Sequence, residues 1–198
     1  MSGNLSVGHC LQTDVLLIGS LFVSAHHRCI KDIIVVHWKA PSPPWLKVNT
    51  YGSVVGNHAT CGVLFRDHLG IFLCTFACNL GIDSIFSSKI QGFLFALEFA
   101  AQNGWSHIWL ESDSTSALMA FKKPYVIPVL IRNRWHNACR LGVQVISSDI
   151  YREGNYYAYR LANIGHAVQG VVWLSALPSE LFLDFFQDIC SLSNYRFP

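Results

Sequence analysis

The sequence is short of charged residues. Asp, Glu, Lys and Arg make up 13% of its 198 residues, about half of the roughly 25% that is usual in soluble domains, whereas 52% of the residues are hydrophobic. This composition excludes a disordered chain, and the length suits one domain with flanking segments. The formal net charge of +2 is too small to predict a nucleic-acid or membrane partner by itself.

Metal-binding and targeting signals are also lacking. The seven Cys contain no CxxC pair and no zinc-ligand spacing, so we expect reduced, mostly buried thiols in an intracellular protein of the nucleus or cytoplasm. The longest apolar run near the N-terminus, residues 15–25, is about half of the roughly 20 residues that a membrane span needs. No Lys or Arg precedes Arg28, which argues against a signal peptide. We expect neither secretion nor a membrane partner.

Prolines between residues 41 and 44 divide the chain. Proline cannot continue a helix or a central strand, so residues 1–40 are predicted to be a flanking segment. The central domain is predicted at residues 41–168, where apolar residues recur with the periods of strands and helices. Residues 169–198 are predicted to form a tail, whose apolar spacing suits one more amphipathic helix.

Apolar periodicity predicts the elements of the central domain. Gly52 is expected to end the first strand, Asp83 to cap the first helix, and the Asn-Gly pair at residues 103–104 to end that helix. The expected strands are residues 46–51, 60–66, 71–79, 107–114 and 143–151, and the expected helices are residues 84–102, 116–123, 129–141 and 155–166. Three hairpin-connected strands followed by alternating strands and helices indicate an α/β fold, with a mixed five-stranded sheet and helices on its faces.

Five motifs follow one another along this pattern. They are W-L-K-V-N-T-Y-G-S at 45–53, F-R-D-x-x-G at 65–70, L-E-S-D-S at 110–114, R-N-R-W-H-N at 132–137 and Y-R-E-G-N-x-x-A-x-R-L-A-N at 151–163. Together they resemble the ribonuclease H-like domain of plants, which occurs at the end of non-LTR retroelement polyproteins and in stand-alone proteins derived from them. The resemblance covers about residues 35–198 and implies the ribonuclease H-like fold.

The resemblance also implies an activity, hydrolysis of the RNA strand of an RNA–DNA hybrid by two magnesium ions. Such ions prefer clustered carboxylate oxygens, and the family supplies four acids, from the first strand, the first helix, the fourth strand and the last helix. In this sequence the four positions fall on Tyr51, Lys89, Asp113 and Tyr159. Asp113 is therefore the sole family acid that is retained.

The charge of these four positions predicts a defective metal site. Four carboxylates carry −4 at neutral pH, whereas Tyr51, Lys89, Asp113 and Tyr159 together carry no net charge. At an effective dielectric constant of 20, a like charge 4 Å from Lys89 is disfavoured by about 4 kcal/mol, and a divalent ion by more. We therefore expect no bound metal and no other cofactor, and we expect Lys89 to pair with Asp113.

Another alignment of the motifs would put other acids in the site, namely Glu98, Glu111 or Glu153. Glu98 lies nine residues, about 2.5 turns, beyond Lys89 and should therefore point to the other side of the helix. Glu111 is expected to share a strand face with Asp113 and is the one credible additional metal ligand. Two carboxylates are still too few to bind the metal ions.

Three functions follow from these observations. The first is binding of nucleic acid such as an RNA–DNA hybrid without cleavage, by a pseudoenzyme in which Lys89 neutralises a phosphate and Arg132, Arg134 and Asn155 add contacts. The second is a retrotransposon-derived relic or a protein-interaction module. The third is an active hybrid nuclease with Asp113 as its retained catalytic acid. The sequence makes no prediction of the oligomeric state.

Overall fold

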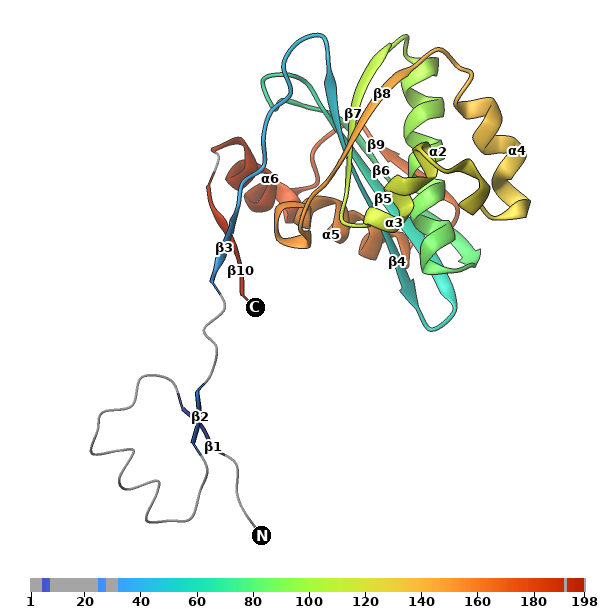
Figure 1. Cartoon of the computed structure of the whole chain (residues 1–198). Coiled ribbons are helices and arrows are strands. Elements are labelled where there is room, and N and C mark those ends of the chain that lie inside the picture. The colour runs from blue at the N-terminus through green and yellow to red at the C-terminus, as the bar shows by residue number, and fades with distance from the viewer. Residues whose placement is uncertain (1–4, 8–24, 28–31, 191, 198) are drawn as a thin grey trace. The chain divides into compact units, whose positions relative to one another are not determined.

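The computed structural model of the chain describes residues 5–7, 25–27, 32–190 and 192–197 (Figure 1). The chain divides into two compact units, residues 1–34 with 195–198, and residues 35–194. In the first unit, β1 (Leu5–Val7) pairs in parallel with β2 (Ala25–His27). β3 (Ile34–Val36) and β10 (Asn194–Arg196) form another two-stranded sheet. The domain boundaries predicted after residues 40 and 168 stay predictions.

The larger unit is built on one six-stranded sheet with the strand order β8-β7-β4-β5-β6-β9. Its strands are β4 (Leu46–Val55), β5 (His58–Arg66), β6 (Phe72–Ile82), β7 (His107–Ser112), β8 (Gln144–Asp149) and β9 (Val171–Leu174). Pairing is parallel between β4, β7 and β8 and antiparallel between β4, β5, β6 and β9. The predicted mixed α/β sheet is confirmed, and β9 adds a sixth strand to the five that the sequence indicated.

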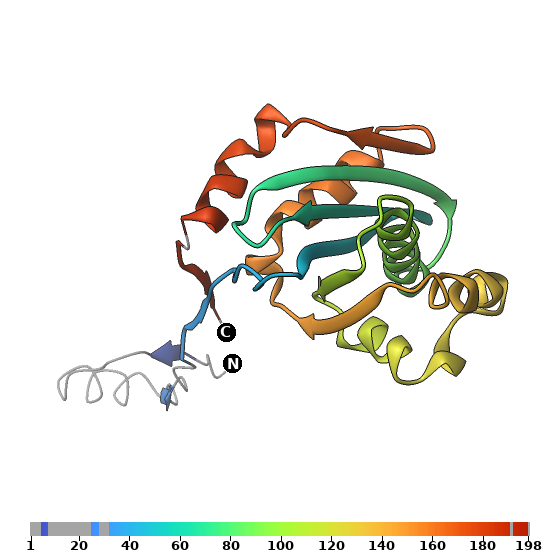
Figure 2. The ribbon, with the colours of Figure 1, turned by 90° about the horizontal axis from the view of Figure 1, so that it is seen from above.

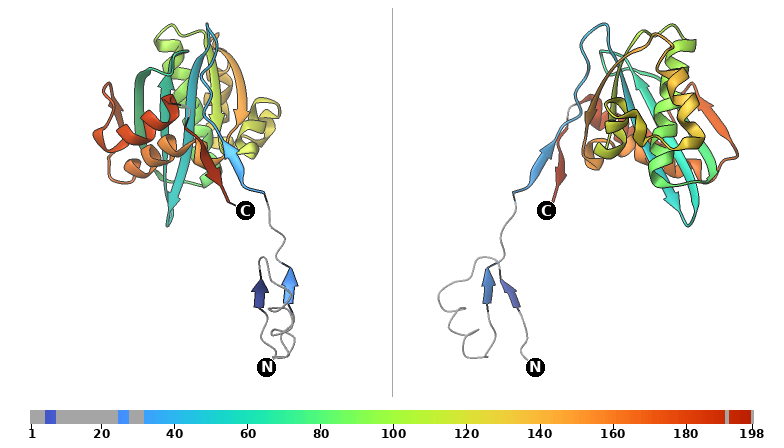
Figure 3. Two further views of the ribbon diagram at one scale, coloured as in Figure 1. Left: turned by 90° about the vertical axis from the view of Figure 1, so that its left-hand side faces the viewer. Right: turned by 45° about the vertical axis from the view of Figure 1, so that its right-hand side comes forward.

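Helices cover both faces of this sheet. The α-helices are α2 (Ile85–Gln102), α3 (Thr115–Leu118), α4 (Val129–Ala138), α5 (Tyr156–Gly165) and α6 (Phe182–Ile189), and the 3-10 turns are η1 (Met119–Phe121), η2 (Pro124–Val126), η3 (Arg152–Gly154) and η4 (Ser179–Leu181). Figure 1 and Figure 2 show α2 and α4 on one face and α5 and α6 on the other. The views from two further sides in Figure 3 agree.

Alternation along β4 divides the core between the two faces. Val48 lies in the larger cluster with Leu94 and Leu97 of α2, and all three are almost fully buried. Tyr51 points the other way and packs against Ala158 of α5. The middle of β4 is therefore buried on both faces, which holds α2 and α5 in fixed positions on either side of it.

The sequence indicated that Gly52 ends the first strand. This prediction is wrong, because β4 continues to Val55. A Cβ at Gly52 would lie 2.8 Å from the Lys89 backbone nitrogen and would also collide with the Ser88 hydroxyl. Glycine is needed at this position because α2 crosses the strand at close approach. A second correction concerns the start of α2. The N-cap is Ser84 and not Asp83, and the Ser84 hydroxyl oxygen accepts a hydrogen bond from the Ser87 backbone N–H.

The described cysteines, residues 61, 74, 78, 139 and 190, are all unpaired thiols. The expectation that the cysteines are mostly buried is wrong for them, since Cys61 and Cys78 are buried but Cys139 and Cys190 are exposed at the ends of α4 and α6. Most of the apolar run at 15–25 lies outside the described residues. In the part of the chain that the structure describes, no helix has the length and apolarity to cross a membrane.

Candidate active site

The structure brings together the four residues that the resemblance assigns to the family's acids, Tyr51, Lys89, Asp113 and Tyr159. Thr50 of β4 pairs with Ser112 of the parallel strand β7, so the next residues lie at the same level, Tyr51 still within β4 and Asp113 just beyond the end of β7. Lys89 is brought to this point by the close crossing of α2 over Gly52. Tyr159 comes from α5 on the opposite face of the sheet.

Lys89 and Asp113 form an ion pair, as the sequence predicted. The Lys89 Nζ lies 2.5 Å from the Asp113 Oδ1, and each side chain is only 11% exposed. The same Nζ lies 4.5 Å from the centre of the Tyr51 ring, a cation–π distance. The positive charge of Lys89 is therefore neutralised by the one retained family acid and held between it and an aromatic ring.

The two tyrosines occupy the remaining positions and contact each other. The rings of Tyr51 and Tyr159 meet edge to face, with centroids 5.2 Å apart and planes at 84°. Tyr51 is 5% exposed, and burial raises the pKa of its phenol to about 12, helped by the negative charge of Asp113 and opposed by the positive charge of Arg152. The Tyr51 phenol is thus neutral at physiological pH and adds no anionic ligand.

This donor set does not fit magnesium. A magnesium ion needs hard, mostly anionic oxygen ligands, and the Asp113 carboxylate already accepts a hydrogen bond from Lys89. Over the described residues, no group of three or more His, Cys, Asp or Glu side chains is placed to hold a metal ion. A pair of neutral rings and one internal ion pair cannot balance the charge of two divalent cations.

The nearby acids do not fill the gap. Glu98 binds Arg134 through both oxygens, at 2.7 and 2.6 Å, which agrees with its predicted position away from the site. Glu111 is 6% exposed and pairs with Lys47 at 2.6 Å. Glu111 and Asp113 lie two residues apart, but the two carboxylates have separate partners, and Asp113 lies just beyond the end of β7 at Ser112.

Three residues predicted to contact nucleic acid make internal hydrogen bonds. Asn155 is 2% exposed and its Nδ2 donates to the Thr50 carbonyl at 2.9 Å. Arg132 donates to the Ile127 carbonyl, and Arg134 is engaged by Glu98. These contacts support the fold, and a role of the three residues in nucleic-acid binding stays a prediction.

Sequence reasoning missed Arg152. This exposed side chain lies in η3, and its guanidinium is 5.5 Å from the Tyr51 ring and 5.6 Å from the Tyr159 ring. The signal was present in the motif Y-R-E-G-N, where Arg152 stands seven residues before Tyr159. Arg152 is the solvent-facing cation of the site, because Lys89 is occupied by Asp113.

A buried polar network next to the site was also missed. Lys47 and Arg66 are 0% and 1% exposed, and they pair with Glu111 and Asp188 respectively. The Arg66 guanidinium stacks on the Trp38 ring at 3.8 Å. Burial lowers the pKa of Lys47 to about 8 despite the opposing effect of Glu111. The network ties β4, β5, β7 and α6 together through charges that are matched in pairs.

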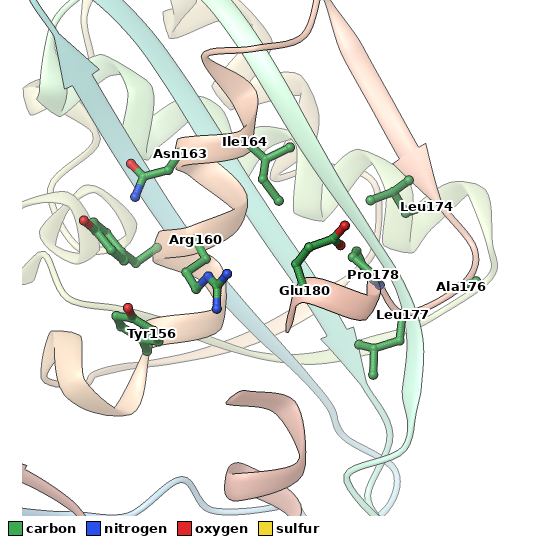
Figure 4. Close-up of a pocket in the computed structure, with 10 residues that line it drawn as sticks. Tyr156, Arg160, Asn163, Ile164, Leu174, Ala176, Leu177, Pro178 and Glu180 are labelled. Atoms are coloured by element: carbon green, nitrogen blue, oxygen red, sulfur yellow. The ribbon is translucent and has the colours of Figure 1, made fainter. Parts of the chain in front are cut away.

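A groove of about 1120 Å³ lies beside the four positions and shares Tyr159 with them (Figure 4). One wall is α5, which contributes Tyr156, Arg160 and Asn163. The other wall is the segment 174–180, which leads from β9 into η4. Arg160 is held in place by Asp184 of α6, whose Oδ2 accepts from Nη1 at 2.7 Å.

Comparison with known proteins agrees with this geometry. Residues 49–165, more than half of the chain, match the family described as reverse transcriptase-like. The chain is 30% identical over 136 residues to the Arabidopsis thaliana protein named "Putative ribonuclease H protein", a match over 65% of this chain. It spans 22% of the length of that relative.

Solved structures show the same fold. RNase H1 of Halobacterium salinarum has a TM-score of 0.55 at 22% identity, over 62% of this chain and 98% of that one. The N-terminal RNase H domain of a Mycobacterium tuberculosis protein has a TM-score of 0.56 at 17% identity, over 62% and 94%. LC11-RNase H1, solved in complex with an RNA/DNA hybrid, has a TM-score of 0.53 at 18% identity, over 60% and 94%. The chain belongs to the reverse transcriptase-like family, and its larger unit contains a ribonuclease H-like domain.

Proposed function

We propose that this ribonuclease H-like domain binds nucleic acid of the RNA–DNA hybrid class and does not cleave it. The observation that supports the proposal is the Lys89–Asp113 ion pair, in which a cation and its counter-ion occupy two of the four positions that the resemblance assigns to magnesium-binding acids. At an effective dielectric constant of 20, Lys89 disfavours a divalent ion 4 Å away by about 8 kcal/mol. At the same distance, the negative charge of Asp113 attracts the ion by about the same energy at most. The two interactions therefore leave no net attraction for the ion.

Binding without metal needs cations that face solvent. Arg152 supplies one at the site, beside Tyr51 and Tyr159. Lys122 and Lys123, between η1 and η2, are also exposed, and neither side chain has a hydrogen-bond or ion-pair partner among the described residues. Contacts between these cations and phosphates do not depend on the base sequence of the nucleic acid. They predict that the affinity for nucleic acid falls as the salt concentration rises. The structure of LC11-RNase H1 with an RNA/DNA hybrid supports the choice of ligand.

The test combines binding and cleavage on one labelled hybrid. Fluorescence anisotropy should show salt-dependent binding that is the same in magnesium and in EDTA, and Arg152→Ala should weaken it. Lys39→Ala, which removes an exposed cation elsewhere, is the matched control. The hybrid should be intact after incubation with magnesium or manganese. Hybrid cleavage that Asp113→Asn abolishes would overturn the proposal, and so would the absence of binding at micromolar protein.

A protein-interaction module is a second candidate, favoured by apolar side chains that face solvent around the start of α4. Tyr125, Val129 and Leu130 are 72%, 75% and 98% exposed. Apolar side chains gathered on a surface often mark a contact with another protein. This candidate would be preferred if no nucleic acid bound in the anisotropy experiment.

A further inference from the structure

We infer that the groove beside α5 is a pocket for one unpaired nucleobase, so that this domain captures single-stranded segments of nucleic acid next to its inactive centre. The inference rests on the proposed nucleic-acid binding and deepens it, because it names a second, different contact and the kind of strand that can make it.

The first argument is the aromatic wall of the groove. Tyr156 and Tyr159 lie one turn apart on α5, with ring centroids 5.6 Å apart and planes at 33°. Tyr159 packs against the buried ring of Tyr51 at a right angle, whereas Tyr156 is 46% exposed. A ring that is fixed and open to solvent can stack on any base, because every base has a π-face.

The second argument is the shape and chemistry of the opposite wall. Leu177 and Pro178 line the groove across from the tyrosines (Figure 4). Apolar side chains facing aromatic rings make a space suited to a flat, largely apolar group such as a base. Asn163 accepts a hydrogen bond from the Ser53 hydroxyl through its Oδ1, which leaves its Nδ2 as a donor for a base edge.

The third argument is the distribution of charge. Glu180 lines the groove, is exposed and has no hydrogen-bond or ion-pair partner among the described residues. Its carboxylate repels phosphate but can accept hydrogen bonds from the amino and imino groups of a base. Arg152 does not line the groove, and its guanidinium, 5.6 Å from the Tyr159 ring, attracts phosphate instead. The base is thus directed into the groove while its backbone passes over Arg152.

The strand must be single for this contact to form. A base inside a duplex is stacked on both sides and paired along its edge, so it cannot also lie against Tyr156 unless it leaves the helix. A single strand offers its bases without that cost. The groove therefore predicts a preference that the charged surface alone would not produce.

The test uses the full chain and two labelled probes, an oligothymidylate of eight nucleotides and a blunt RNA–DNA hybrid of the same length. Tyr156→Ala should weaken binding of the single strand about 5-fold to 150-fold, the loss of one stacked base, and should leave hybrid binding unchanged. Tyr156→Phe should keep wild-type affinity for both probes. Tyr195→Ala, which removes an exposed tyrosine of β10, is the matched control and should change neither.

Photocrosslinking gives an independent readout. The same oligonucleotide with 5-bromouracil should crosslink to Tyr156 or Tyr159, as located by mass spectrometry. Equal effects of Tyr156→Ala and Tyr195→Ala on the single strand, or crosslinks only outside the groove, would overturn the inference. If hybrid binding persisted in that case, the proposed function would stand without the pocket, whereas loss of binding to both probes by the wild type would refute both.

Discussion

Breaking the Lys89–Asp113 ion pair should destabilise the domain by an amount that can be worked out from its burial. Removing one partner of a fully buried pair costs about 3 to 5 kcal/mol, because a buried charge is left alone. Each side chain here keeps 11% of its exposure, so we expect about 2 to 3 kcal/mol for Lys89→Met. In a domain of this size the melting temperature should fall by about 4 to 12 °C.

A double-mutant cycle separates the pair from other effects of each substitution. We expect Lys89→Met and Asp113→Asn together to destabilise less than the sum of the two single changes, with a coupling energy of about 1.5 to 3 kcal/mol. The Arg134–Glu98 pair is the control, since its side chains are 36% and 29% exposed. Its coupling energy should be about 1 kcal/mol or less. Urea unfolding of the wild type and of the six variants in the two cycles gives both values.

Two results would refute this reasoning. A coupling energy for Lys89 and Asp113 no larger than that of the exposed control pair would show that the two charges do not depend on each other in solution. A Lys89→Met protein as stable as the wild type would show that Asp113 finds other compensation, which would include a bound cation.

Three further predictions concern the neighbouring structure. Gly52→Ala should destabilise the domain by about 1 to 3 kcal/mol in urea unfolding, because its Cβ collides with the backbone of Lys89, and an unchanged midpoint would contradict the close crossing of α2. Asp188→Asn should cost about 3 kcal/mol, since it leaves the Arg66 guanidinium buried without a counter-ion, and hydrogen exchange should show α6 losing protection first. The folded pKa of Lys47, about 8, lies below its ordinary 10.5, so between these pH values the unfolded chain binds the extra proton and the free energy of unfolding should rise with pH. Relative to Lys47→Met, the wild type should gain about 1 to 3 kcal/mol across that range, and parallel pH profiles of the two proteins would contradict the low pKa.

The main elements could be predicted because their patterns are local. Alternation along β4 and apolar residues three and four apart in α2 report burial on one face, and Asn103 caps α2 at its C-terminus as expected. β9 was missed because its four residues, Val-Val-Trp-Leu, show no alternation and stand in a segment whose longer pattern indicates a helix. Gly52 was misread because a glycine that ends a strand and one that admits a helix look the same in sequence.

The candidate site was predictable to the extent that motif and charge determine it. The resemblance assigned the four positions to Tyr51, Lys89, Asp113 and Tyr159, and opposite charge predicted the ion pair that the structure contains. Burial was not predictable, since one sequence does not distinguish an amide that faces a ligand from one that, like Asn155, bonds to the Thr50 carbonyl. Cation–aromatic contacts such as those of Arg152 also depend on how a short turn is oriented.

Manganese binding measured by electron paramagnetic resonance tests the central claim most directly, because Mn²⁺ takes the oxygen sites of magnesium and its free ion is counted in solution. We predict that the wild-type chain leaves Mn²⁺ free at equimolar protein. The variant that combines Tyr51→Asp, Lys89→Glu and Tyr159→Asp should bind the ion, because it regains three carboxylates around Asp113. Stoichiometric binding of Mn²⁺ by the wild type that Asp113→Asn abolishes would contradict the account.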